Sequence, residues 1–93
     1  MKKQRELKDL DGIGKEMLKD FVVLGVGSVA ELARRNPEKL YEQLCVKTGQ
    51  RQDICVLDVF RCAVAQARAH VGNRRLPAAQ RNWWWWSRLR KKG

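Results

Sequence analysis

The sequence predicts an all-α fold. Apolar residues recur at helical spacing in every long segment, helix-capping residues stand at the segment ends, and no segment alternates with the two-residue period of a strand. The order helix, glycine-bearing turn, helix occurs over residues 7–24 and again, more loosely, over 37–70, with a short connecting helix between them. Two such hairpins bury their apolar stripes against each other and form one core. We therefore expect a five-helix bundle up to about residue 70.

The first three helices are expected from spacing and caps. Leu7 and Leu10 indicate a short amphipathic helix that ends at the glycines of DLDGIGK, residues 9–15. The second helix starts at about Lys15 and ends at Gly25. Ser28 followed three residues later by Glu31 is the capping-box pattern, so the connecting helix is expected over 29–35.

The last two helices have equally plain start signals. Asn36 followed by Pro37 predicts an N-cap with proline at the first helical position, and that helix is expected to end near Gly49. Asp53 is expected to cap the longest helix, which ends at Gly72 and Asn73.

Charge divides the chain into two parts. The formal net charge is +10, and the residues from 71 onward contribute seven basic side chains and no acidic one, which leaves +3 for residues 1–70. We expect a folded domain over 1–72 and a basic C-terminal tail over 73–93. A positive field of this kind favours polyanionic partners, nucleic acid or an acidic membrane surface, although it also serves solubility.

The cysteines and the histidine indicate no metal and no cofactor. Cys45, Cys55 and Cys62 are an odd number without close CxxC spacing, so buried thiols are expected. A zinc site that also uses His70 is the less favoured alternative. The basic N-terminus lacks a following apolar segment and no run is long enough to span a bilayer, so a cytoplasmic location is expected.

The stretch DLDGIGK is a short glycine-bearing turn between two expected helices. Two helices that reverse direction over so short a link need glycine where φ is positive or where a side chain would clash. Ile13 is expected to point inward, while the backbone amides of Gly12, Ile13 and Gly14 face outward at the start of the next helix. Because a helix N-terminus attracts phosphate oxygens, and Lys15 and Lys19 add positive charge, the turn is a candidate phosphate-backbone site.

The residues from Leu7 to Lys15 resemble the helix-hairpin-helix motif of many DNA repair and recombination proteins. The segments LGVGSVAELARRNPEKLYEQLC (24–45) and CVLDVFRCAVAQAR (55–68), followed by a Trp-rich tail, are similar to the pathogenicity-locus family of small bacterial proteins. Many members of that family carry the label mitomycin-resistance protein. The resemblance implies a tandem helix-hairpin-helix (SAM-like) bundle and a DNA-associated role.

Two features of the turns favour a purely structural reading instead. Asp11 precedes the first glycine, and its carboxylate would repel a phosphate bound close by. The second turn, KTGQRQD, keeps one glycine, so that Gly49 and Arg51 are candidates for a second phosphate contact or simply parts of a link.

Four consecutive tryptophans stand in the tail. One interpretation docks two of them, most simply Trp83 and Trp86, on the helical bundle. Another is base stacking by the aromatic faces while basic residues neutralise phosphates; an anionic membrane surface is a third. The stacking and phosphate candidates are Trp83, Trp84, Trp85, Trp86, Arg81, Arg88, Arg90, Lys91 and Lys92.

Catalysis has little support. GIGK is too short to wrap a triphosphate, the acidic residues are scattered, and one histidine is the only imidazole. We therefore expect a binding protein: a small DNA-binding module, with DNA favoured over RNA, that grips phosphates without reading bases. The alternative is a protein-interaction module that uses the tryptophans.

Overall fold

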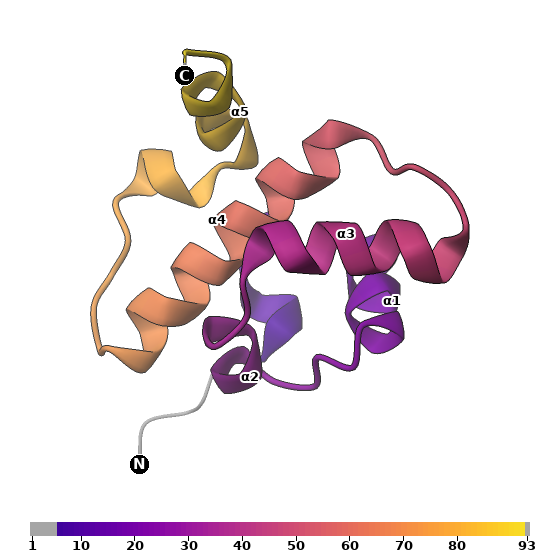
Figure 1. The fold of residues 1–93 in the computed structure, drawn as a ribbon. Coiled ribbons are helices and arrows are strands. Elements are labelled where there is room, and N and C mark those ends of the chain that lie inside the picture. The colour runs from indigo at the N-terminus through magenta and orange to yellow at the C-terminus, as the bar shows by residue number, and fades with distance from the viewer. Residues whose placement is uncertain (1–5, 93) are drawn as a thin grey trace.

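The computed structural model describes residues 6–92, and over this range it contains helices and no strand. The elements are η1 (Leu7–Asp9), α1 (Lys15–Val23), α2 (Val29–Ala33), α3 (Pro37–Thr48), α4 (Ile54–Val71), η2 (Ala78–Arg81) and α5 (Trp83–Lys92). The expected all-α class is confirmed. The long helix α4 runs through the centre of the molecule, and α2, α3 and α5 pack against it (Figure 1).

Among residues 6–92, four α-helices lie before residue 72, where the sequence predicted five. The segment at Leu7 is a single 3-10 turn rather than an α-helix, because the glycine turn follows too soon for a full α-helical turn to close. The fifth α-helix of the described residues is instead α5, which lies in the segment that the sequence analysis treated as a tail. The division into a domain over 1–72 and a tail over 73–93 stays a prediction.

Capping residues set the helix starts as the sequence indicates. Ser28 accepts a hydrogen bond from the backbone N–H of Glu31, while the Glu31 carboxylate accepts one from Gly27 N–H, one residue before the N-cap. Asn36 accepts from the N–H groups of the two residues after Pro37. Asp53 accepts from Cys55 N–H, and this bond lowers the pKa of the Asp53 carboxyl.

The core is apolar and lies between α4 and the helices before it. Phe21 of α1 and Phe60 of α4 are fully buried, with ring centroids 5.8 Å apart, and Leu32, Leu40 and Leu44 fill the space around them. The side chain of Arg68 on α4 donates to the carbonyl of Ala33, which fastens the end of α2. Burial of this apolar stripe holds the four helices together and sets where the glycine turn before α1 stands.

Candidate nucleic-acid interface

The turn before α1 presents open backbone. Gly12 has φ +83°, a left-handed conformation that favours glycine, and Gly14 is the extended N-cap of α1. A Cβ at Gly12 or Gly14 would meet no atom within 4 Å, so neither glycine makes room for a neighbouring side chain. Ile13 packs half-buried against the core, and its N–H donates to Leu10 C=O at 3.3 Å, so this amide does not face outward as expected. The backbone at Gly12 and Gly14 is therefore accessible to a ligand.

A buried glutamine holds the turn in place. Gln66 of α4 accepts a hydrogen bond from Asp11 N–H and donates one to Asp11 C=O, each 2.9 Å long. Gln66 is only 3% exposed, so both bonds are shielded from water. The position of the turn relative to α4 is thus set by a contact between residues that are 55 apart in sequence.

The charges around the turn have both signs. Lys15 and Lys19 are exposed, and the Lys19 ammonium lies 4.0 Å from the carboxylate of Glu16. Partial burial and the neighbouring Glu16 raise the pKa of Asp20. The Asp11 carboxylate, 3.6 Å from Arg81 Nη1, is partly neutralised by the C-terminal segment.

An open pocket of about 400 Å³ lies beside the turn. Its wall includes Gly12, Gly14 and Lys15 from the turn, and Trp83 from α5. Met17, Val56 and Val59 add apolar surface, and Glu16, Asp20 and Cys55 complete the lining. The fold therefore brings three candidate phosphate-binding residues and one candidate stacking residue to a single concave surface.

The second glycine turn has a different character. Gly49 has φ +66° and ends α3 in the left-handed conformation, with its N–H bonded to Val46 C=O. Local contacts close the rest of the link: the Tyr41 hydroxyl donates to Gln52 C=O, and the Gln52 side chain donates to the Thr48 hydroxyl. Arg51 is exposed. Neither Gly49 nor Arg51 lines the pocket beside the first turn.

The four tryptophans begin α5 and differ in exposure. Trp83 and Trp84 are 38% and 43% exposed, whereas Trp85 and Trp86 are half-buried and meet edge to face, with ring centroids 5.0 Å apart. The Trp86 indole N–H donates to Gln80 C=O at 2.8 Å. Arg88 lies over the Trp84 ring, 4.8 Å from its centroid. Two indoles thus remain accessible.

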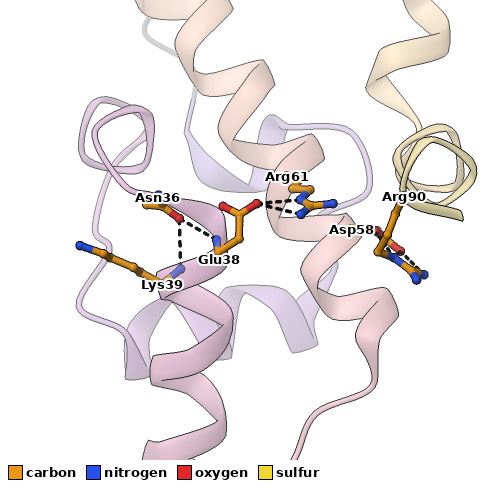
Figure 2. A network of polar contacts seen from close by, with 6 residues as sticks. All are labelled: Asn36, Glu38, Lys39, Asp58, Arg61 and Arg90. Carbon is orange, nitrogen blue, oxygen red and sulfur yellow. Dashed lines mark hydrogen bonds and ion pairs between the residues drawn. The ribbon is translucent and has the colours of Figure 1, made fainter. Parts of the chain in front are cut away.

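The basic residues of the tail also divide into two groups. Arg90 forms a two-pronged contact with Asp58 of α4, with Nε 3.0 Å from Oδ1 and Nη2 3.1 Å from Oδ2 (Figure 2). The Asp58 side chain is fully buried and that of Arg90 is 25% exposed. Arg88, Lys91 and Lys92 are exposed, and none of them pairs with a carboxylate of the described residues. The charge of Arg90 is therefore committed to holding α5, while the other three charges are available.

A buried polar stripe on α4 was not predicted from the sequence. Asp58, Cys62 and Gln66 recur every four residues on one face of the helix, and all three are buried. They contact Arg90, the carbonyl of Gln80 and the backbone of Asp11, respectively. Burial raises the pKa of the Cys62 thiol to about 11. The signal in the sequence was the i, i+4, i+8 spacing of polar residues on an otherwise apolar helix.

Residues 6–92 hold no group of three potential metal ligands close together. All three cysteines are reduced, and Cys45 and Cys55 are half-buried. Within the same range, every helix is too short or too polar to cross a lipid bilayer.

Comparisons with known proteins give a family and one relative. A family model described as Pathogenicity locus (Cdd1) matches residues 1–92. The chain is 37% identical over 62 residues to the mitomycin resistance protein McrB of Streptomyces lavendulae, a match that covers 67% of this chain and 59% of the relative. The match thus spans less than two thirds of that protein. No solved structure matches the chain.

Proposed function

The chain belongs to the pathogenicity-locus family, and we propose that it is a small DNA-binding module that grips the phosphate backbone without reading sequence. In this proposal the two helical hairpins form a tandem helix-hairpin-helix unit. The amides of Gly12 and Gly14, together with Lys15 and Lys19, bind phosphate oxygens. Gly49 and Arg51 provide a second, weaker contact.

One observation carries the proposal: the glycine turn and Trp83 line the same pocket. A strand that places a phosphate on the open amides of Gly12 and Gly14 has its neighbouring base beside Trp83. Stacking of a base on an aromatic ring contributes about 1–3 kcal/mol. Glu16 and Asp20 of α1 also line this pocket and their carboxylates repel a phosphate, so the phosphate lies on the side of Gly12, Gly14 and Lys15.

The uncompensated basic residues of α5 extend the interface. Arg88, Lys91 and Lys92 strengthen binding through phosphate neutralisation, whereas Arg90 acts on α5 through Asp58. We propose binding rather than catalysis, in the cytoplasm. The mitomycin resistance of the relative is consistent with a role at damaged DNA.

A titration of labelled single- and double-stranded oligonucleotides at several salt concentrations tests this proposal. With about 3–6 phosphate contacts, the affinity is expected to fall steeply with salt, with a log–log slope of about −2 to −5. Lys15→Glu is expected to weaken binding at least tenfold, while Lys39→Glu, an equal charge change at an exposed residue of α3, has a smaller effect. Circular dichroism is the check that both variants are folded.

Two results would count against the proposal. Absence of salt-sensitive binding near physiological ionic strength rejects DNA binding altogether. Equal effects of Lys15→Glu and Lys39→Glu, with binding lost on deletion of residues 82–93, reject the turn as the contact and leave the tail.

A second candidate, a protein-interaction module, is favoured by exposed apolar residues. Val22 and Val46 are 79% and 80% exposed, and Val23 and Trp84 are each more than 40% exposed. Pull-down of a partner that is lost on Val22→Asp, with no oligonucleotide binding, supports this alternative.

A further inference from the structure

A second pocket, of about 200 Å³, lies where α4 ends and the chain turns towards η2. Its polar lining consists of Gln66 and His70 of α4, Arg74 and Arg75 of the following link, and Arg81 of η2. No acidic residue of the described chain lines this pocket. The pocket is separate from the one beside Trp83, and none of its residues lines that other pocket.

The charge in this pocket is strongly positive. Three guanidinium groups line it, and Asp11, 3.6 Å from Arg81 Nη1, is the carboxylate that pairs with one of them. Arg74 and Arg75 have no carboxylate partner among residues 6–92. The carbonyl end of α4 adds roughly half a negative charge, which the guanidiniums outweigh.

Arg81 also carries an unused donor. Its Nε is enclosed and has no hydrogen-bond partner among the described residues. An enclosed donor of this kind costs stability unless a ligand or water accepts from it. Arg74 lies folded back against the helix end, since a Cβ at Gly72 would stand 3.2 Å from Arg74 Nε. Arginines of the link and of η2 therefore line the same pocket.

The size of the pocket limits the ligand. Pockets for drug-sized molecules measure roughly 300–1,000 Å³, and a water molecule takes roughly 30 Å³ of liquid volume. A volume of about 200 Å³ is sufficient for a phosphate group. Guanidinium groups match the oxygens of phosphate with paired N–H donors, which makes arginine the preferred residue for such a site.

We propose that this pocket binds a terminal phosphate, that is, a phosphate monoester at the end of a DNA strand. A monoester is favoured over an internal phosphodiester because it carries nearly two negative charges and has one covalent exit from the pocket rather than two. Asp11 and Gln66 join the pocket to the glycine turn, so a strand gripped at the turn has its end close to the arginines. The inference rests on the proposed function for the source of the phosphate.

The test compares oligonucleotides of one sequence with a 5′-phosphate, a 3′-phosphate or hydroxyl groups at both ends. Fluorescence anisotropy gives each Kd for the full-length wild type, for Arg74→Gln/Arg75→Gln, and for Arg34→Gln/Lys39→Gln as a control with the same charge change. All four substituted residues are exposed, and the two control residues line no part of the pocket. We expect one phosphorylated end to bind about tenfold tighter than the hydroxyl end. That ratio is expected to fall to about one in the pocket variant and to persist in the control.

The outcomes separate this inference from the proposed function. Salt-sensitive binding with equal affinities for all three ends overturns the pocket proposal and leaves the DNA-binding module standing. A preference that survives Arg74→Gln/Arg75→Gln but not the control substitutions also overturns it. If no oligonucleotide binds, titration with a nucleoside 5′-monophosphate followed by ³¹P NMR decides whether the pocket binds a free phosphate monoester. Binding that the pocket variant loses supports a site for a free phosphate monoester, and no binding rejects the site.

Discussion

The helices up to Val71 and the segment after it are held by different kinds of contact. The first part packs through an apolar core in which Phe21, Leu32 and Phe60 have no exposed surface. The second part adds two ion pairs, Arg90 with Asp58 of α4 and Arg81 with Asp11 of the first turn, beside the half-buried indoles of Trp85 and Trp86. Figure 1 shows α5 on one end of the molecule, reached through η2.

This difference has consequences for function. Apolar burial is non-directional, so the core tolerates some change of shape, whereas each polar contact requires its own partner in place. The C-terminal segment brings Trp83 to one pocket and Arg81 to the other. Both candidate sites therefore combine residues of the C-terminal segment with residues of the helices that form the core.

The largest expected effect comes from the core. Phe60→Ala removes a fully buried ring that touches Phe21 and leaves a cavity, so the free energy of unfolding is expected to fall by about 3–5 kcal/mol. Urea denaturation followed by circular dichroism measures it. Leu89→Ala, at a site 51% exposed on α5, is the matched control and should change stability by less than about 0.5 kcal/mol. Similar losses of unfolding free energy in the two variants would show that the core does not contribute more to stability than the exposed surface of α5.

Loss of the ion pair between Arg90 and Asp58 is expected to have the second-largest effect on stability. Arg90→Met leaves the Asp58 carboxylate buried without its partner, a change that costs about 3–5 kcal/mol for a fully buried pair. We expect about 2–3 kcal/mol, discounted from that range because Arg90 is 25% exposed and because α5 can lift away to hydrate Asp58.

The rate of Cys62 alkylation reports this movement directly. Cys62 is 1% exposed and its thiol contacts Gln80 C=O, so in a Cys45→Ala/Cys55→Ala background it should react slowly and become faster with Arg90→Met. Replacing both Asp58 and Arg90 with leucine removes the unpaired charge and should recover much of the stability. Unchanged alkylation with Arg90→Met would show that the pair does not hold the segment.

The Cys62 thiol gives an alkaline pH dependence. Burial raises its pKa from 9.0 to about 11, so the folded state retains the proton that the unfolded chain releases. This contribution is complete below pH 9 and is lost as the pH rises towards 11, by about 2 kcal/mol relative to Cys62→Ala, whose own titrating groups serve as the control. Parallel stability curves for wild type and Cys62→Ala over that interval would refute the prediction.

The smallest expected change in stability distinguishes the half-buried from the exposed tryptophans. Trp86→Phe loses the hydrogen bond from the indole N–H to Gln80 C=O and should lower the free energy of unfolding by about 1 kcal/mol. Trp84→Phe, at 43% exposure, is the control and should be nearly neutral. Thermal denaturation compares the two, and equal shifts would assign no stability to the hydrogen bond.

Local sequence signals predicted much of the first part of the molecule. The caps at Ser28, Asn36 and Asp53 are confirmed, because a capping side chain bonds a backbone N–H only two or three residues away. Periodicity likewise predicted the longest helix, but not that its face with Asp58, Cys62 and Gln66 is also buried. The candidate turn was visible as DLDGIGK, whereas the pocket that it shares with Trp83 was not, since nothing in either segment indicates that they meet.

The sequence by itself thus determined α1 to α4 with boundaries to within a few residues, the position of the glycine turn and the uneven charge, but not α5. Only the tertiary structure decided that Gln66 holds Asp11, that Arg90 is bound to Asp58, and that Arg74, Arg75 and Arg81 surround one pocket. The physical reason is the separation along the sequence over which each interaction acts. Periodicity and capping act within a few residues, while the contacts of Arg90 and Gln66 join positions 32 and 55 residues apart, and such pairs form only after the apolar core has brought them together.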